Sequence, residues 1–202
     1  MAISFDTELI AAAKNGLTAR LIDLLALRVE SGLINPDALV VAAGGGYARC
    51  VDLLLPFCDP KFEDSLALRY AASNGHEECV KLLAPLSDPQ ALSCAALRLS
   101  AARGNVECVK FLLPLSYSDF ALSDALNSSL TLGSTRLLAA LLAHDPDLLE
   151  REKLDLPALF SQSLAARHGE MALFLGSIID QQAIGDCLPP APCSKPPTSH
   201  RI

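Results

Sequence analysis

The sequence predicts an all-α protein: a solenoid of about six helix-turn-helix repeats with short inter-repeat turns and a disordered Pro-rich C-terminal tail. Two observations support this fold class. A glycine recurs every 29 residues, at Gly46, Gly75, Gly104 and Gly133. The residues around each glycine repeat as well, with Ala-Leu and a small pair before it and a Leu pair after it. A fixed period of this size is typical of stacked supersecondary units.

Each copy divides into two short helices. In the copy around Gly75, the residues Leu68, Ala71 and Ala72 are spaced to form one apolar stripe, and the same spacing recurs after the glycine. Gly75 lies where the first helix must stop, and glycine tolerates the positive φ of a helix C-terminal cap. Pro85 then ends the second helix. The pattern therefore predicts a helix on each side of every recurring glycine, which we call the template glycine of its repeat.

We expect one repeat domain over residues 1–186 and a disordered tail over residues 187–202, because five prolines after position 188 disfavour a helix. The predicted repeats are about 6–34, 35–63, 64–92, 93–121, 122–150 and 157–186. Seven extra residues separate the last two glycines of the template, Gly133 and Gly169. This insertion, at 148–154, is either a recognition loop or tolerated drift. The tail is either passive or a ligand for an aromatic groove.

The copies resemble the ankyrin repeat. The matching positions are Leu68, Ala71, Ala72, Gly75, His76, Glu78, Val80, Leu82 and Leu83. Two departures stand out: Arg69 and Arg98 occupy the position of the family's histidine, and the period is 29 where the family has about 33. The resemblance therefore implies that the family's β-hairpins are shortened to tight turns, as in bacterial ankyrin proteins.

Composition and charge limit the kinds of partner and cellular location that we expect. The formal net charge is −7, without a block of Lys or Arg, so a nucleic-acid partner is unsupported. No apolar run is long enough to span a membrane, and the first residues lack the features of a signal peptide. We expect a monomeric, cytoplasmic protein, and delivery into a host cell stays open.

The seven cysteines fit the repeat better than they fit a chemical site. Cys50, Cys79 and Cys108 share one template position, which Leu21, Leu137 and Leu173 fill in other copies. Exchange with leucine predicts a buried apolar position. Four cysteines lie elsewhere, Cys58 in a turn, Cys94 at the start of a helix, and Cys187 and Cys193 in the tail, where we expect them to be reduced.

No catalytic motif is evident. Gly44-Gly45-Gly46 lacks the Lys-Ser/Thr of a phosphate-binding loop, and in the family His76 with Glu78 belongs to the ordinary start of a second helix. We therefore expect no enzyme activity, cofactor or metal. The alternative is a thiol- or metal-dependent enzyme that uses the cysteines outside the core.

The predicted function is that of a protein–protein interaction module, with the partner on the helix and turn face of the array. Effector, immunity protein and scaffold are not separable by sequence. The resemblance and the repeat pattern give these candidate partner-binding residues: Lys14, Asn15, Ser65, Arg69, Ser73, Asn74, Arg98, Arg103, Arg167 and His168. Arg69 and Arg98 either anchor an acidic segment of the partner or pair within the array.

Overall fold

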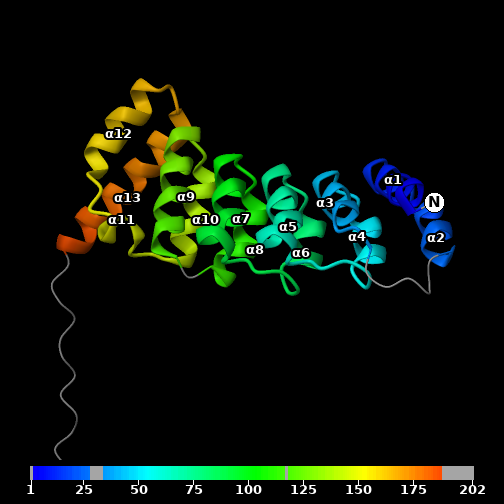
Figure 1. Cartoon of the computed structure of the whole chain (residues 1–202). Helices are drawn as coiled ribbons and strands as arrows, with labels where there is room; N and C mark the ends of the chain where they lie inside the picture. Colours follow the sequence, from blue (N-terminus) through cyan, green and yellow to red (C-terminus); the bar gives the residue numbers. More distant parts are fainter. Residues whose placement is uncertain (1, 28–33, 117, 188–202) are drawn as a thin grey trace, which may run out of the picture. The chain divides into compact units, whose positions relative to one another are not determined.

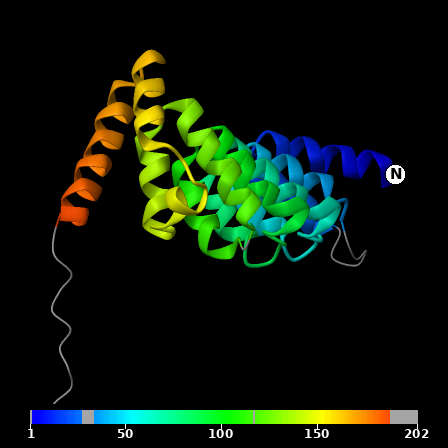
Figure 2. The ribbon, with the colours of Figure 1, turned by 90° about the vertical axis from the view of Figure 1, so that its left-hand side faces the viewer.

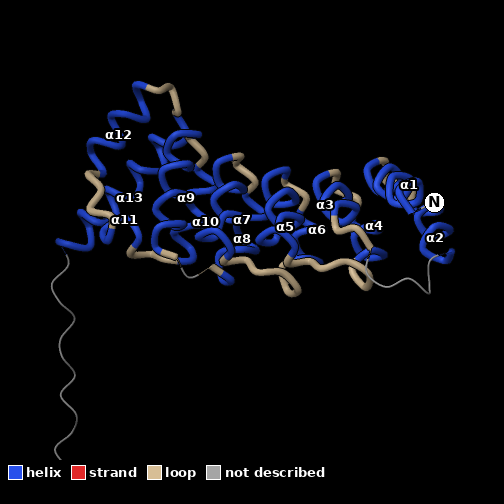
Figure 3. The backbone as a smooth tube through the Cα atoms, in the orientation of Figure 1, coloured by secondary structure: helices blue, strands red, loops and turns tan. Residues whose placement is uncertain are grey.

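The computed structural model describes residues 2–27, 34–116 and 118–187 (Figure 1). Over these residues the chain consists of helices and loops, without a strand (Figure 3). It divides into two compact units, Met1–Leu154 and Asp155–Ile202. The all-α repeat architecture predicted by the sequence is confirmed.

The first unit consists mainly of helix pairs, as the pattern predicts. Its pairs are α1 (Ala2–Lys14) and α2 (Thr18–Leu27), α3 (Asp37–Gly44) and α4 (Ala48–Leu54), α5 (Phe62–Asn74) and α6 (Glu77–Leu83), α7 (Ala91–Ala102) and α8 (Val106–Leu112), and α9 (Asp119–Leu132) and α10 (Thr135–His144). A 3-10 turn, η1 (Leu113–Leu115), follows α8, and the short helix α11 (Leu148–Arg151) follows α10.

The pairs of this unit stack in two rows. The first helices of the pairs, α1, α3, α5, α7 and α9, lie side by side, and the second helices form the other row (Figure 1). Viewed after a quarter turn, the same pairs lie one behind another (Figure 2). The turns within pairs and the linkers between pairs lie at opposite ends of the helices (Figure 3). The row of first helices therefore presents a continuous outer face.

Each turn within a pair of this unit contains a glycine in the left-handed region, with φ from 62° to 79°. At Gly75 the N–H of the next residue, His76, donates to the carbonyl of Ala71 at 2.9 Å, which closes the end of α5. An L-residue would be strained at this φ, so glycine suits this position.

In the second, third and fourth repeats the residue after the turn glycine also contacts the preceding repeat. His76 Nε2 donates to the carbonyl of Gly44 at 3.0 Å. One repeat later, Asn105 Nδ2 donates to the carbonyls of Ala72 at 3.0 Å and Ser73 at 2.7 Å. These bonds satisfy carbonyls at helix ends, which lack partners within their own helix. They also fix the spacing between neighbouring repeats.

This contact leaves no room for a side chain on the preceding glycine. A Cβ added to Gly46 would lie 2.6 Å from His76 Nδ1, and one added to Gly16 would lie 2.4 Å from the Tyr47 ring. The glycines at 46 and 16 are thus needed for close approach as well as for their positive φ.

The core is a ladder of equivalent side chains. Seven residues before each turn glycine stands a leucine that is at most 1% exposed; these are Leu9, Leu39, Leu68, Leu97 and Leu126. Cys50, Cys79 and Cys108 are also buried, which confirms that this position belongs to the core. Small Ala and Cys side chains let neighbouring helices pack closely.

The first copy differs at the same core position. Counted from its turn glycine, Arg20 rather than Leu21 corresponds to the cysteines, so our assignment of Leu21 was wrong by one residue. Arg20 pairs with Glu8 of α1 at 2.9 Å, and both side chains are about half exposed. A half-exposed charged pair thus stands in this repeat at the position where later repeats have a buried cysteine.

The first turns of α5 and α7 contain an unusual left-handed stretch, and no β-hairpin precedes them among the described residues. Three consecutive residues, Glu63, Asp64 and Ser65, have φ between 47° and 59°, and the equivalent residues Leu92–Cys94 do the same. For residues other than glycine this conformation costs roughly 1–2 kcal/mol each. Arg69 holds the first of these turns, since its guanidinium donates to the carbonyls of Glu63 at 2.7 Å and Asp64 at 3.2 Å.

The insertion after the fifth repeat is an ordered part of the first unit. Leu148 of α11 is fully buried. Arg151 pairs with Asp145 at 2.8 Å and lies 3.6 Å from Asp119 of α9. These contacts give the segment a structural role, and a recognition role for it stays a prediction.

The second unit contains α12 (Leu156–Ala165) and α13 (Gly169–Cys187). Their turn repeats the bonding of the other pairs, since His168 N–H donates to the Ser163 carbonyl at 2.9 Å. The residue with positive φ, however, is Arg167, at 62°. Arg167 therefore takes the place of the template glycine, and our alignment of Gly169 to that place was wrong by two residues.

The corrected register changes which side chains of α13 are buried. Met171 and Leu175 are at most 1% exposed, whereas Leu173, which we expected at the cysteine position, is 77% exposed. From Gly133 to Arg167 is 34 residues, so the insertion comprises five residues rather than seven. The predicted tail lies outside the described residues from residue 188 on.

A matched pair of glycine substitutions tests the contact between turns. Gly104→Ala introduces strain at φ 72° but meets only Leu132 Cδ1 at 3.6 Å, so we expect it to cost about 1–2 kcal/mol of unfolding free energy. Gly46→Ala adds a collision with His76, and we expect about 1 kcal/mol more from the disturbed hydrogen bond. Denaturant unfolding measures both values. Equal losses would contradict a role for the contact with His76.

Substitution of Cys108 tests the core position. We expect Cys108→Leu to be tolerated nearly neutrally, because Leu137 fills the equivalent site one repeat later and is itself fully buried. Cys108→Asp places an unpaired charge in the core and should cost about 3 kcal/mol or more. Thermal unfolding compares the two variants with the wild type, and equal tolerance of both would refute a core assignment.

Candidate binding surface

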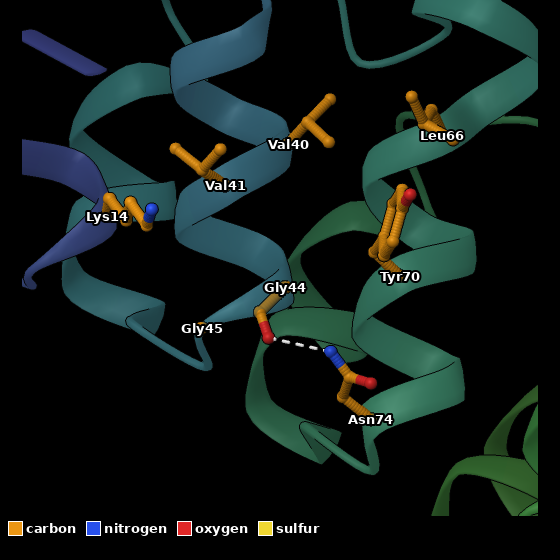
Figure 4. Close-up of a pocket in the computed structure, with 8 residues that line it drawn as sticks. All are labelled: Lys14, Val40, Val41, Gly44, Gly45, Leu66, Tyr70 and Asn74. Carbon is orange, nitrogen blue, oxygen red and sulfur yellow. Dashed lines mark hydrogen bonds between the residues drawn. The ribbon is translucent and has the colours of Figure 1, made fainter. Parts of the chain in front are cut away.

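The outer face of the first helices contains a hollow between α3 and α5 (Figure 4). Its volume is about 520 Å³. The lining residues are Lys14, Val40, Val41, Gly44, Gly45, Leu66, Tyr70 and Asn74. They come from three consecutive repeats, so the hollow exists only in the stacked array.

Two glycines create the space. Gly44 and Gly45 stand where the next repeat has Ser73 and Asn74, and they leave the end of α3 without side chains. The Tyr70 side chain lies on the opposite side of the hollow, on α5 (Figure 4). Asn74 Nδ2 donates to the Gly44 carbonyl at 2.8 Å, which joins the two helix ends. The floor of the hollow is therefore fixed by a hydrogen bond between repeats.

A second hollow of about 250 Å³ adjoins the first. Its lining residues are Leu66, Arg69, Tyr70, Ser73 and Leu99. Leu66 and Tyr70 line both hollows. We call the two hollows together the groove; it runs across the first helices from Lys14 on α1 to Leu99 on α7.

The groove exposes apolar side chains. Tyr70 is 49% exposed and Leu99 is 40% exposed. Together with Val41 they occupy one repeat position, five residues before the turn glycine. Our candidate list missed this position. The sequence does contain a signal for it: an apolar residue recurs there in three repeats, on the helix face away from the buried leucine ladder.

The charged residues of the groove are cations. Lys14 has no ion pair among the residues described, and Arg69 bonds to backbone carbonyls. Among the described residues, no carboxylate lines either hollow. The groove is thus apolar with a positive rim, in a chain whose formal net charge is −7.

Several other candidate residues lie near the groove. Ser73 lines the second hollow. Asn15 follows α1, where its side chain donates to the Ala11 carbonyl at 2.7 Å. Arg103 is exposed directly after α7. These residues share the end of the first-helix row that carries the turns.

Two candidates have internal partners. Arg98 Nε donates to Asp124 Oδ2 at 2.7 Å, and its guanidinium lies 4.9 Å from the centre of the Phe120 ring. Arg98 was predicted either to anchor an acidic segment of the partner or to pair within the array, and in the structure it pairs within the array. Ser65 is 1% exposed and its Oγ accepts from the Asp88 N–H at 2.8 Å, so its side chain is not available to a partner. We correct the candidate list by removing Ser65.

The remaining candidates, Arg167 and His168, lie in the turn of the second unit. Arg167 is exposed and His168 is partly buried. The structure does not bring them into the groove's set of lining residues.

Two cysteines outside the repeated position, Cys58 and Cys94, are buried too. Cys58 is 5% exposed and Cys94 is 1% exposed. Burial raises the pKa of the Cys58 thiol to about 11, with a smaller opposing effect from a backbone hydrogen bond. A thiol of this kind is a poor nucleophile near neutral pH. Among the described residues, no three His, Cys, Asp or Glu side chains form a group that could hold a metal ion.

These features define a helical-repeat protein with an apolar groove on its row of first helices. Comparison with known families identifies the repeats: residues 9–92 match the model of ankyrin repeats, in three copies. This match supports an ankyrin-repeat protein. No curated protein matches it by sequence. Ankyrin repeats are generally protein-interaction modules, and the family is typically non-enzymatic. Within the described residues, no helix is both long and apolar enough to cross a membrane.

Thiol labelling tests the burial of the cysteines. In a variant with Cys187→Ser and Cys193→Ser, we expect the five other thiols to react slowly with Ellman's reagent at pH 8 while the protein is folded. Burial raises the pKa of Cys58, Cys79 and Cys108 to about 11, so their reactive thiolate form is scarce at that pH. All five should react in guanidinium. Rapid labelling of Cys58 or Cys94 in the folded protein would instead favour the thiol-enzyme alternative.

Proposed function

We propose that this ankyrin-repeat protein is a non-catalytic interaction module that binds a protein partner through the groove. The observation that carries the proposal is the exposed Tyr70, which separates two hollows and contributes to both. Aromatic residues at the centre of an interface often supply much of its binding energy. The leucine ladder packs the array without this side chain, so its exposure is better explained by binding than by stability.

The proposed surface has an apolar centre and a polar rim, which is the usual anatomy of a protein interface. Its centre consists of Val40, Val41, Leu66, Tyr70 and Leu99, and its rim of Lys14, Asn15, Arg69, Ser73, Asn74 and Arg103. A standard contact buries about 800 Å² per partner. Several adjacent repeats are needed to supply that area, and the groove spans α1 to α7.

The proposal also includes the protein's cellular setting. We propose that the protein acts as a monomer in the cytoplasm. An effector, an immunity protein and a scaffold would all use the groove in the same way. Arg167 and His168 remain proposed contacts of the second unit, apart from the groove.

Removal of the Tyr70 ring tests the function. A partner is first captured on the immobilised chain from the source cells and identified by mass spectrometry. We expect Tyr70→Ala to weaken its binding by about 2 kcal/mol, roughly thirtyfold in Kd, by calorimetry. The matched control is Leu86→Ala, because Leu86 is equally exposed, at 49%, but lies in a linker.

A second variant fills the groove instead of emptying it. A Cβ on Gly44 would meet Tyr70 Cβ at 3.6 Å, an ordinary contact, so Gly44→Leu should fold while its side chain occupies the first hollow. We expect loss of binding with little change in melting temperature. Full affinity in both Gly44→Leu and Tyr70→Ala would place the partner elsewhere on the protein.

A further inference from the structure

We infer that the occupant of the groove is an acidic, aliphatic segment of the partner protein, bound in an extended conformation. This inference rests on the proposed function and adds the chemistry of the ligand. Apolar side chains of the segment would enter the two hollows, and its carboxylates would meet Lys14 and Arg69.

The geometry of the hollows favours an extended segment. They lie on either side of Tyr70, in neighbouring valleys of the first-helix row. Helices in contact pack roughly 8–10 Å apart. Alternate side chains of an extended chain lie on one face, about 7 Å apart. Two alternate aliphatic residues can therefore reach the two hollows, with Tyr70 between them.

The charges of the rim favour an acidic segment. Lys14 lines the first hollow without an ion pair among the described residues. Arg69 lines the second; its guanidinium donates to neutral backbone carbonyls and forms no ion pair among the described residues. Arg98, in the next repeat, is compensated by Asp124. Complementary charge of this kind contributes to specificity and to the association rate.

The overall charge argues against a nucleic acid as the anionic ligand. Binding to a phosphate backbone depends on several Lys or Arg contacts, and this chain has a formal net charge of −7. Two cations without an ion pair among the described residues, beside apolar walls, suit a peptide with scattered carboxylates better than a continuous polyanion.

Peptide display tests the inference. A random 12-residue library is selected on the full chain, and peptides that also bind the Tyr70→Ala variant are removed. We expect the remaining peptides to be enriched in Asp and Glu around Leu, Ile or Val at alternate positions. Groove-dependent peptides without acidic enrichment would overturn the inference and leave the proposed function intact. Failure to obtain any Tyr70-dependent peptide would count against both.

A charge reversal tests the contact with the rim. Lys14→Glu is chosen because Arg69 also holds a turn. For a selected acidic peptide we expect its Kd to rise about tenfold and its dependence on salt to weaken. The matched control, Arg49→Glu on α4, makes the same change in net charge in the other row and should alter Kd less than twofold. Equal effects of the two variants, or stoichiometric displacement of the peptide by a poly(dT) oligonucleotide, would overturn the inference.

Discussion

In the middle of the array, neighbouring repeats are joined by the residue after a turn glycine, which packs against the turn of the preceding repeat. His76 lies over Gly46 and donates to the Gly44 carbonyl, and Asn105 makes the corresponding contact one repeat later. The contact needs a glycine for two reasons, positive φ and the absence of a Cβ. It sets the spacing at which the small Ala and Cys side chains of neighbouring helices meet, so the leucine ladder depends on it.

The groove follows from the same arrangement of turns. Gly44 and Gly45 directly precede a turn glycine, and together they leave the end of α3 bare. Stacking then places Tyr70 of the next repeat opposite that bare end, and Asn74 fixes the distance with its hydrogen bond. The hollow thus requires only small local changes in a repeat whose core is unaltered.

Arg69 contacts both the left-handed turn at the start of α5 and the groove. It stands where the family has histidine, and its bonds to Glu63 and Asp64 stabilise a left-handed turn that replaces a longer hairpin. Its positive charge also lies at the rim of the second hollow. Arg98 occupies the equivalent position but pairs with Asp124. Equivalent residues of a repeat can therefore differ in function because their neighbours differ.

The sequence by itself determined the helix pairs, the turn glycines and the buried cysteine position, because each is a local constraint that recurs with the period. It did not determine the register of the last pair, where Arg167 adopts the positive φ and Gly169 misleads the alignment. It also missed the left-handed first turns of α5 and α7, the burial of Ser65 and the groove around Tyr70. Only the tertiary structure decided these features, because they depend on which side chains from neighbouring repeats come into contact, and the period of a single chain does not contain that information.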